Sequence, residues 1–248
     1  MVLPVISFVF IALATVVLGG AAWANGFFDR QEPGPLEYVL LGIFYFVAYF
    51  IGIFFNAAVV GAATIRLQGG DPSVRDGLRL ASSKVGKIAG WAAISATVGL
   101  ILRSLEERFG FIGNIVISII GVAWSVVTFF VVPVLLFEPV GVVDGIKRSA
   151  GIFRQRWGET FVGNAAIGVA VFLVSLPALL VAGVLAAISV PLGVVVGILA
   201  VGLMVAVGSA MTGIFNAALY RFATTGEAPG AFNQDDLRGS FRPKRRAR

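Results

Sequence analysis

The polar side chains inside the apolar stretches of this 248-residue chain are the residues that could do chemistry there. Asn56 and Asn216 are the most unusual, because an Asn inside a membrane must find hydrogen-bond partners. Both lie in the motif Phe-Asn-Ala-Ala, at 55–58 and again at 215–218, which indicates a weak internal repeat. We interpret the two Asn residues as structural links between helices, with a solute or headgroup site as the alternative.

Ionisable side chains, which mark proton and ion pathways in membranes, are absent from the centres of these stretches. Glu106 and Glu107 are adjacent, so on a helix they point apart and make a poor acid–base pair. Glu138 precedes Pro139 and is interpreted as a first-turn acid of a surface helix. The chain contains no Cys and no His, which excludes thiol chemistry and zinc sites of the Cys/His type. We therefore expect no enzymatic activity and no cofactor.

Six apolar stretches with almost no charged residues must position these side chains. A bilayer core of about 30 Å needs about 20 apolar residues per helix, so the stretches predict membrane spans. We predict an all-α, polytopic transmembrane helix bundle with six spans, near 3–25, 39–65, 88–105, 112–137, 161–188 and 190–220. Residues 1–222 form this domain, and residues 223–248 are predicted to be a basic, mostly disordered cytoplasmic tail.

The positive charges predict the orientation of the bundle. All but three of the 19 Lys and Arg residues fall in alternate gaps between the spans or in the tail. Cytoplasmic loops carry the excess of Lys and Arg. Both termini are therefore predicted on the cytoplasmic side of the membrane. Ala22-Trp23-Ala24 is typical of a signal-peptide cleavage site, but no positive residue precedes the first stretch, so cleavage there is the alternative to a first span.

Each of the two basic gaps is predicted to form an amphipathic helix on the inner surface, and Asp71 is the expected N-cap of the first. The expected apolar faces consist of Val74, Leu78, Val85 and Ile88 in one helix, and Ile146, Phe153 and Trp157 in the other. Each cation near an anionic leaflet contributes about 1 kcal/mol to binding. The candidate lipid-headgroup contacts are Arg75, Arg79, Lys84, Lys87, Lys147, Arg148, Arg154 and Arg156. The simpler interpretation is that these cations only determine topology.

The stretch from Trp124 to Gly168 carries a resemblance, which is most specific between Pro133 and Trp157. Its motifs are FVVPVLL at 130–136, VVDGIKRS at 142–149 and RWG at 156–158. The chain resembles a prokaryotic family of uncharacterised integral membrane proteins, distantly similar to the membrane region that accompanies some glycerophosphodiester phosphodiesterases. The resemblance supports a six-span bundle and supplies no catalytic residues. The resemblance implies a prokaryotic plasma (inner) membrane as the location. Members begin with a charged cytoplasmic helix before the first span, whereas this chain starts at about the span itself, which leaves the true start open between Met1 and a position upstream.

We expect a non-enzymatic integral membrane protein that interacts with lipids or acts as a membrane scaffold. Its expected partners are anionic lipid headgroups, with a second copy of the chain or a cytoplasmic protein as further candidates and no nucleic acid. The alternative is a facilitator or permease for a small or amphiphilic solute, with a cavity near Asn56, Asn216 and a helix kink at Pro133. A water-filled cavity there would favour the permease, and a packed interior would argue against it.

Overall fold

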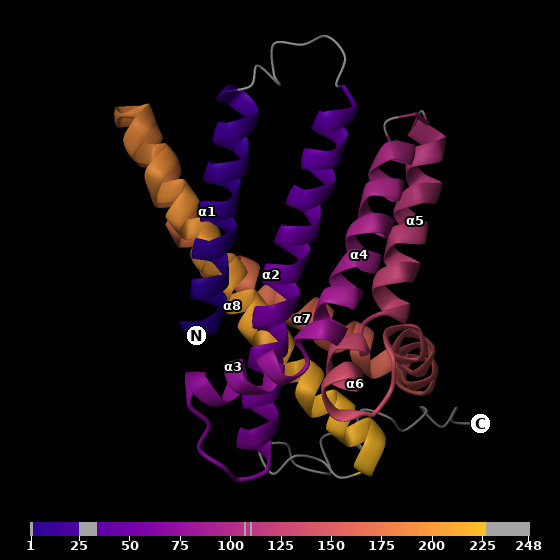
Figure 1. Cartoon of the computed structure of the whole chain (residues 1–248). Helices are drawn as coiled ribbons and strands as arrows, with labels where there is room; N and C mark the ends of the chain where they lie inside the picture. The colour runs from indigo at the N-terminus through magenta and orange to yellow at the C-terminus, as the bar shows by residue number, and fades with distance from the viewer. Residues whose placement is uncertain (1, 25–33, 107, 110, 227–248) are drawn as a thin grey trace, which may run out of the picture.

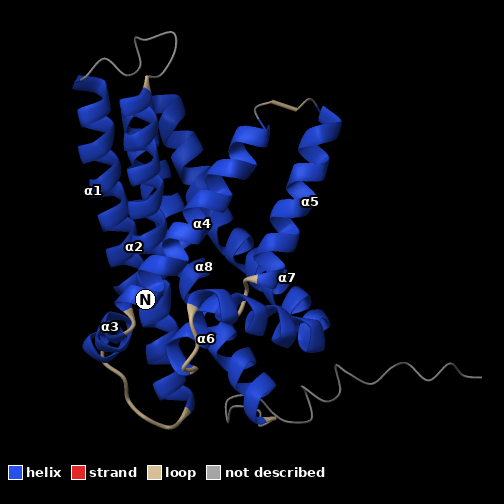
Figure 2. Cartoon of the chain, turned by 45° about the vertical axis from the view of Figure 1, so that its right-hand side comes forward, coloured by secondary structure: helices blue, strands red, loops and turns tan. Residues whose placement is uncertain are grey.

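The computed structural model describes residues 2–24, 34–106, 108–109 and 111–226, and it describes their side chains except at 18, 21–24, 35–37, 111–112 and 155–166. The regular structure in these ranges is entirely α-helical (Figure 2). The helices are α1 Val2–Ala24, α2 Pro35–Leu67, α3 Val74–Ser83, α4 Val85–Glu106, α5 Phe111–Val127, α6 Val131–Phe137, α7 Val142–Ile188 and α8 Val190–Thr225.

Five segments of the described chain are long and apolar enough to cross a membrane. They are Tyr38–Leu67, Val85–Glu106, Gly113–Phe137, Ile167–Ile188 and Val190–Thr225. These segments confirm a multi-span membrane protein and match five of the six predicted spans. The sixth corresponds to α1, whose described apolar part, Val2–Val17, is shorter. Helix α1 lies beside α2 and also contacts α8 (Figure 1). A count of six therefore stays a prediction.

The largest buried core lies at one end of the bundle, where α3 and α6 are (Figures 1 and 2). Val60 of α2, Ile88 of α4 and Leu136 of α6 are almost completely buried there. The opposite halves of the long helices keep many apolar side chains exposed, such as Val174 in α7 and Ile119 in α5. Such surfaces suit a lipid solvent, in which apolar side chains need no burial.

Helix α3 packs closely against α2 because small residues line the contact. A Cβ added to Gly77 would lie 2.5 Å from the carbonyl oxygen of Ala58, and Ala81 is fully buried. The side chain of Leu80 lies over Gly61 in the same way. A larger residue at position 77 could not be accommodated without moving the backbone. This contact fixes α3 to the end of α2.

The predicted start and length of the first surface helix were wrong. Its N-cap is Ser73, whose hydroxyl accepts a hydrogen bond from the Asp76 amide, while the Asp76 carboxylate accepts from the Ser73 amide. Asp71, the predicted cap, instead pairs with Arg66 at 2.7 Å. The helix ends at Ser83 with Lys84 as its C-cap, and α4 begins at Val85. The apolar periodicity continues across this break, so the pattern did not reveal it.

The predicted apolar face of this segment is therefore divided between two helices. Ile88 belongs to α4 and is buried in the core, and Leu78 of α3 is half-buried. Val74 and Val85 are exposed. The second predicted surface helix is not separate either, because it continues into the fifth span as the 47-residue α7. No proline interrupts residues 142–176, so nothing in the sequence stops that helix.

Replacing Gly77 with Ala should weaken the docking of α3. The added methyl group meets a backbone oxygen of α2, and such overpacking costs about 1–3 kcal/mol. Thermal unfolding in detergent measures the loss of stability. The matched control is Gly86→Ala in α4, where a Cβ meets open space and Ala favours the helix. Equal stability of the two variants would contradict the packing of α3 described above.

The Ser73–Asp76 capping box should make α3 pH-dependent. The hydrogen bond from the Ser73 hydroxyl, followed by that from its amide, lowers the pKa of Asp76. A lowered folded pKa gives stability that is present above the unfolded value of about 3.9 and is lost as pH falls through the folded value. Thermal midpoints of wild type and Asp76→Asn should therefore differ near neutral pH and converge in acid. Asp71→Asn controls for loss of a negative charge, and a pH-independent difference would refute the assignment.

Candidate functional site

A helix break lies within the fourth predicted span, where the sequence predicted only a kink. Helix α5 ends at Val127, α6 begins at Val131, and the chain forms a turn between them. Phe130, Val131 and Val134 around this break are fully buried. A break inside a membrane span is tolerated only where other groups satisfy the freed backbone. Side chains of neighbouring helices must therefore provide these partners.

Ser149 of α7 satisfies two of the freed backbone groups. Its hydroxyl donates to the carbonyl oxygen of Val127 at 2.6 Å and accepts from the amide of Phe130 at 2.9 Å. Ser149 is completely buried, so these hydrogen bonds are shielded from water. One side chain thus serves as the C-terminal partner of α5 and the N-terminal partner of α6.

Asn216 of α8 satisfies the third group. In a continuous helix the carbonyl of Phe129 would accept from residue 133, but Pro133 has no amide hydrogen. The Asn216 Nδ2 donates to that carbonyl instead, at 3.1 Å. Asn216 is 6% exposed, and its Oδ1 makes no hydrogen bond in the described part of the chain. The amide of Asn216 therefore joins α8 to the break.

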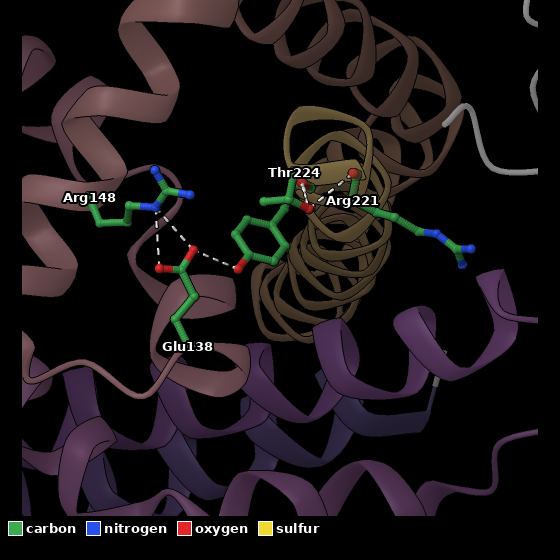
Figure 3. A network of polar contacts seen from close by, with 5 residues as sticks. Glu138, Arg148, Arg221 and Thr224 are labelled. Atoms are coloured by element: carbon green, nitrogen blue, oxygen red, sulfur yellow. Dashed lines mark hydrogen bonds and ion pairs between the residues drawn. The ribbon is translucent and has the colours of Figure 1, made fainter. Parts of the chain in front are cut away.

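Just beyond α6, the carboxylate of Glu138 connects two further helices. Arg148 Nε of α7 donates to Glu138 Oε1 and Oε2 at 3.1 and 3.2 Å, and the Tyr220 hydroxyl of α8 donates to Oε1 at 3.0 Å (Figure 3). The Lys87 ammonium of α4 donates to the Glu138 backbone carbonyl at 3.1 Å. The Glu138 side chain is 21% exposed. Four helices meet at this one residue.

Glu138 was assigned the wrong structural role from the sequence. It is the C-cap of α6, with an extended backbone, and not a first-turn acid of the following helix. Its interaction is with side chains of α7 and α8, which are distant in the sequence. Tyr220 and Ser149 were not among the candidate residues. Nothing in the local pattern marks them, because their role depends on tertiary contacts that periodicity does not encode.

The candidate lipid contacts divide into two groups. Lys87 and Arg148 bind Glu138, and Lys147 pairs with Asp144 at 3.2 Å. The others with described side chains make no side-chain hydrogen bond or ion pair to the described residues; they are Arg75, Arg79, Lys84 and Arg154. Arg156 lies outside the residues whose side chains are described.

Arg221, near the end of α8, has a structural role that the sequence analysis did not assign. Its Nη1 donates to the carbonyl oxygen of Leu67 at 2.7 Å. Leu67 is the last residue of α2, so the cation lies at a helix C-terminus, where positive charge is favourable. Figure 3 shows Arg221 pointing away from Glu138. Arg221 thus attaches α8 to α2, and Lys87 attaches α4 to Glu138, at the same end of the bundle.

Asn56 does not hydrogen-bond to Asn216 in the structure. Its Nδ2 lies 3.7 Å from the position that a Cβ on Gly213 would take, so it faces α8 one turn before Asn216. The two Asn residues are thus near neighbours along the contact between α2 and α8. Among the described residues, no cluster of three or more potential metal-ligating side chains occurs.

Comparison with known proteins identifies a family. A model described as a family of unknown function, DUF6159, matches residues 36–230, from the first turn of α2 to just beyond α8. No curated protein and no solved structure matches the chain. The matched range contains the helix break and the three hydrogen-bond partners of Glu138, which are Lys87, Arg148 and Tyr220.

Replacing Ser149 with Ala should destabilise the break. The variant leaves the buried Phe130 amide without its partner, and such a loss costs about 1–3 kcal/mol. Unfolding in detergent measures the change in free energy. Ser125→Ala is the matched control, because Ser125 is exposed and its hydroxyl donates to the Gly121 carbonyl of its own helix. Similar effects of the two substitutions would contradict a special role for Ser149.

Proposed function

This chain belongs to the family DUF6159, and we propose that it is a non-enzymatic integral membrane protein that binds anionic lipid headgroups at the basic end of its bundle. We further propose that this end faces the cytoplasm of a prokaryotic cell, with both termini on that side. Similarity to the membrane region of some glycerophosphodiester phosphodiesterases remains part of this proposal and adds no catalytic residue.

The arrangement of the elements supports this orientation. Helix α3, helix α6, the start of α4 and the end of α8 gather at one end of the molecule (Figure 1). The cations of the first basic gap lie mainly on α3 and at the start of α4, and those of the second lie in the first part of α7, which begins just after α6, so the two groups share one end. The cytoplasmic leaflet is the anionic one, and it attracts basic residues close to a membrane span.

The single observation that carries the lipid proposal is the position of Arg75 and Arg79 on α3. These residues are four positions apart and therefore share one helix face. Gly77 and Ala81, which pack against α2, lie on the other face. Both Arg side chains are exposed and make no ion pair with the described residues. A fixed helix thus holds two available guanidinium groups away from the bundle, and guanidinium is well matched to phosphate.

The packing around the helix break argues against the permease alternative. Pro133 and its neighbours Phe130 and Val134 are fully buried, and the Asn216 Nδ2 donates to the Phe129 carbonyl. A solute route would need polar groups facing an open space at this depth. Asn216 serves here to complete the backbone of a neighbouring helix. The geometry therefore favours a surface role for the polar chemistry of this protein.

The double variant Arg75→Gln/Arg79→Gln should lose most of its anionic-lipid preference. Two cations near an anionic leaflet contribute about 2 kcal/mol, which corresponds to an affinity about 30-fold lower without them. The measurement is the ratio of phosphatidylglycerol to phosphatidylcholine retained by protein purified from nanodiscs that contain both lipids. Arg108→Gln, a cation in the gap between α4 and α5, is the control for charge loss.

A topology check must accompany this experiment, because the same cations could orient the protein. The chain has no native Cys, so Ser82→Cys, exposed on α3, gives a single labelling site. It should be labelled only from the cytoplasmic side in both backgrounds. An unchanged lipid ratio in the double variant, with topology intact, would overturn the lipid proposal. Labelling from outside in the wild-type background would overturn the orientation.

A further inference from the structure

We propose that the groove between α1, α2 and α8 holds one acyl chain of an anionic phospholipid, whose phosphate binds Arg66 at its mouth. The proposal builds on the proposed function, because both place an anionic lipid at the basic end. It nevertheless names a different cation and adds a site for the hydrocarbon chain. The two proposals can therefore fail separately.

The groove is a cavity of about 320 Å³ next to the start of α3. Its walls are small or aliphatic residues: Leu3 of α1, Val59 and Ala63 of α2, and Ala210 and Ile214 of α8. This volume lies at the lower end of the range for small-molecule sites, about 300–1,000 Å³. Alanines at positions 63 and 210 leave the space between the helices unfilled.

The apolar walls of the groove favour a hydrocarbon chain as its occupant. A buried water needs two to four polar partners, and the walls formed by α1, α2 and α8 offer almost none until Arg66. All three helices are apolar, and α2 and α8 contain segments of membrane-spanning length. The groove is open to its surroundings, so in a bilayer a lipid chain can enter it from the side. A free phosphate ion has no apolar part with which to fill this space.

Arg66 provides a positive charge for the lipid phosphate at the mouth of the groove. Its Nη1 pairs with Asp71 at 2.7 Å, but the side chains are 68% and 96% exposed. Such an exposed pair contributes little, so a phosphate can replace the carboxylate as the partner of the guanidinium. Residues 66–87 contain five basic and two acidic residues, so the local charge is positive. If the phosphate of phosphatidylglycerol binds Arg66 at the mouth of the groove, an acyl chain of the same lipid can extend into the groove.

A second apolar cavity provides the contrast. It has a volume of about 210 Å³ and lies between α7 and α8, with Val171, Ser175, Leu203 and Met204 in its walls. Its lining contains no charged residue. Hydrocarbon can fill both cavities, but only the groove at Arg66 should prefer an anionic headgroup. This difference allows matched variants on one helix, α8.

The first experiment is native mass spectrometry of the full chain in detergent, titrated with phosphatidylglycerol or phosphatidylcholine. Arg66→Gln should lower the preference for phosphatidylglycerol about fivefold, the effect of one cation, and leave phosphatidylcholine binding unchanged. Ile214→Trp should abolish retention of the tightest phosphatidylglycerol by filling the groove. Leu203→Trp, at an exposed wall position of the other cavity, should retain it. Arg75→Gln/Arg79→Gln should also retain it, which separates this site from the α3 surface.

The second experiment uses the unaltered protein and so does not depend on a variant that folds. Phosphatidylglycerol with a photoreactive group on its acyl chain should crosslink to residues 59–63 and 210–214 in preference to residues 171–175. Crosslinking without this preference would overturn the proposal, as would full lipid retention by Ile214→Trp. Competition by millimolar inorganic phosphate as strong as that by lipid would also overturn it, because it would show a headgroup site with no role for the groove.

Discussion

The interruption between α5 and α6 is the constraint on which the basic end of this molecule depends. In a bilayer each unsatisfied backbone group costs several kcal/mol, so the interruption exists only because α7 and α8 complete it. Ser149 accepts and donates at the break itself, and Asn216 reaches the carbonyl that Pro133 leaves without a partner. The buried side chains of Ser149 and Asn216 thus connect four helices, α5, α6, α7 and α8, at this interruption.

The short α6 that results carries Glu138 to the junction of α4, α7 and α8. Its carboxylate is mostly buried, and a buried carboxylate is tolerated only with charged or hydrogen-bonding partners. Arg148 and Tyr220 provide them, and Lys87 donates to the backbone carbonyl of the same residue. The polar contacts and the largest apolar core therefore lie at the same end of the bundle, and the opposite halves of α5 and α7 present apolar surface to lipid.

The membrane helices could be predicted from the sequence because the hydropathy and the length of a stretch are local properties. The positions at which the helices are interrupted could not be predicted in this way. The periodicity from Val74 to Ile88 runs through Lys84 without interruption, although the chain begins a new helix there. Pro133 predicted a kink in the helix. Whether the helix bends or ends there depends on Ser149 and Asn216, which follow it in the sequence and belong to other helices. Glu138 likewise gained its role only from tertiary partners. The local pattern therefore specifies the helices, and at the α5–α6 break it is distant polar contacts that determine where one helix ends.

The structure also separates cations that the charge pattern treats as equal. Lys87, Arg148 and Arg221 make contacts that hold the bundle together, whereas Arg75 and Arg79 remain exposed on a helix fixed by Gly77. A cation that determines topology acts during insertion, but it stays beside the anionic leaflet after folding. The topological and lipid-binding interpretations therefore do not compete at these two positions. Once the bundle has folded, Arg75 and Arg79 keep the exposed positions that the lipid proposal requires.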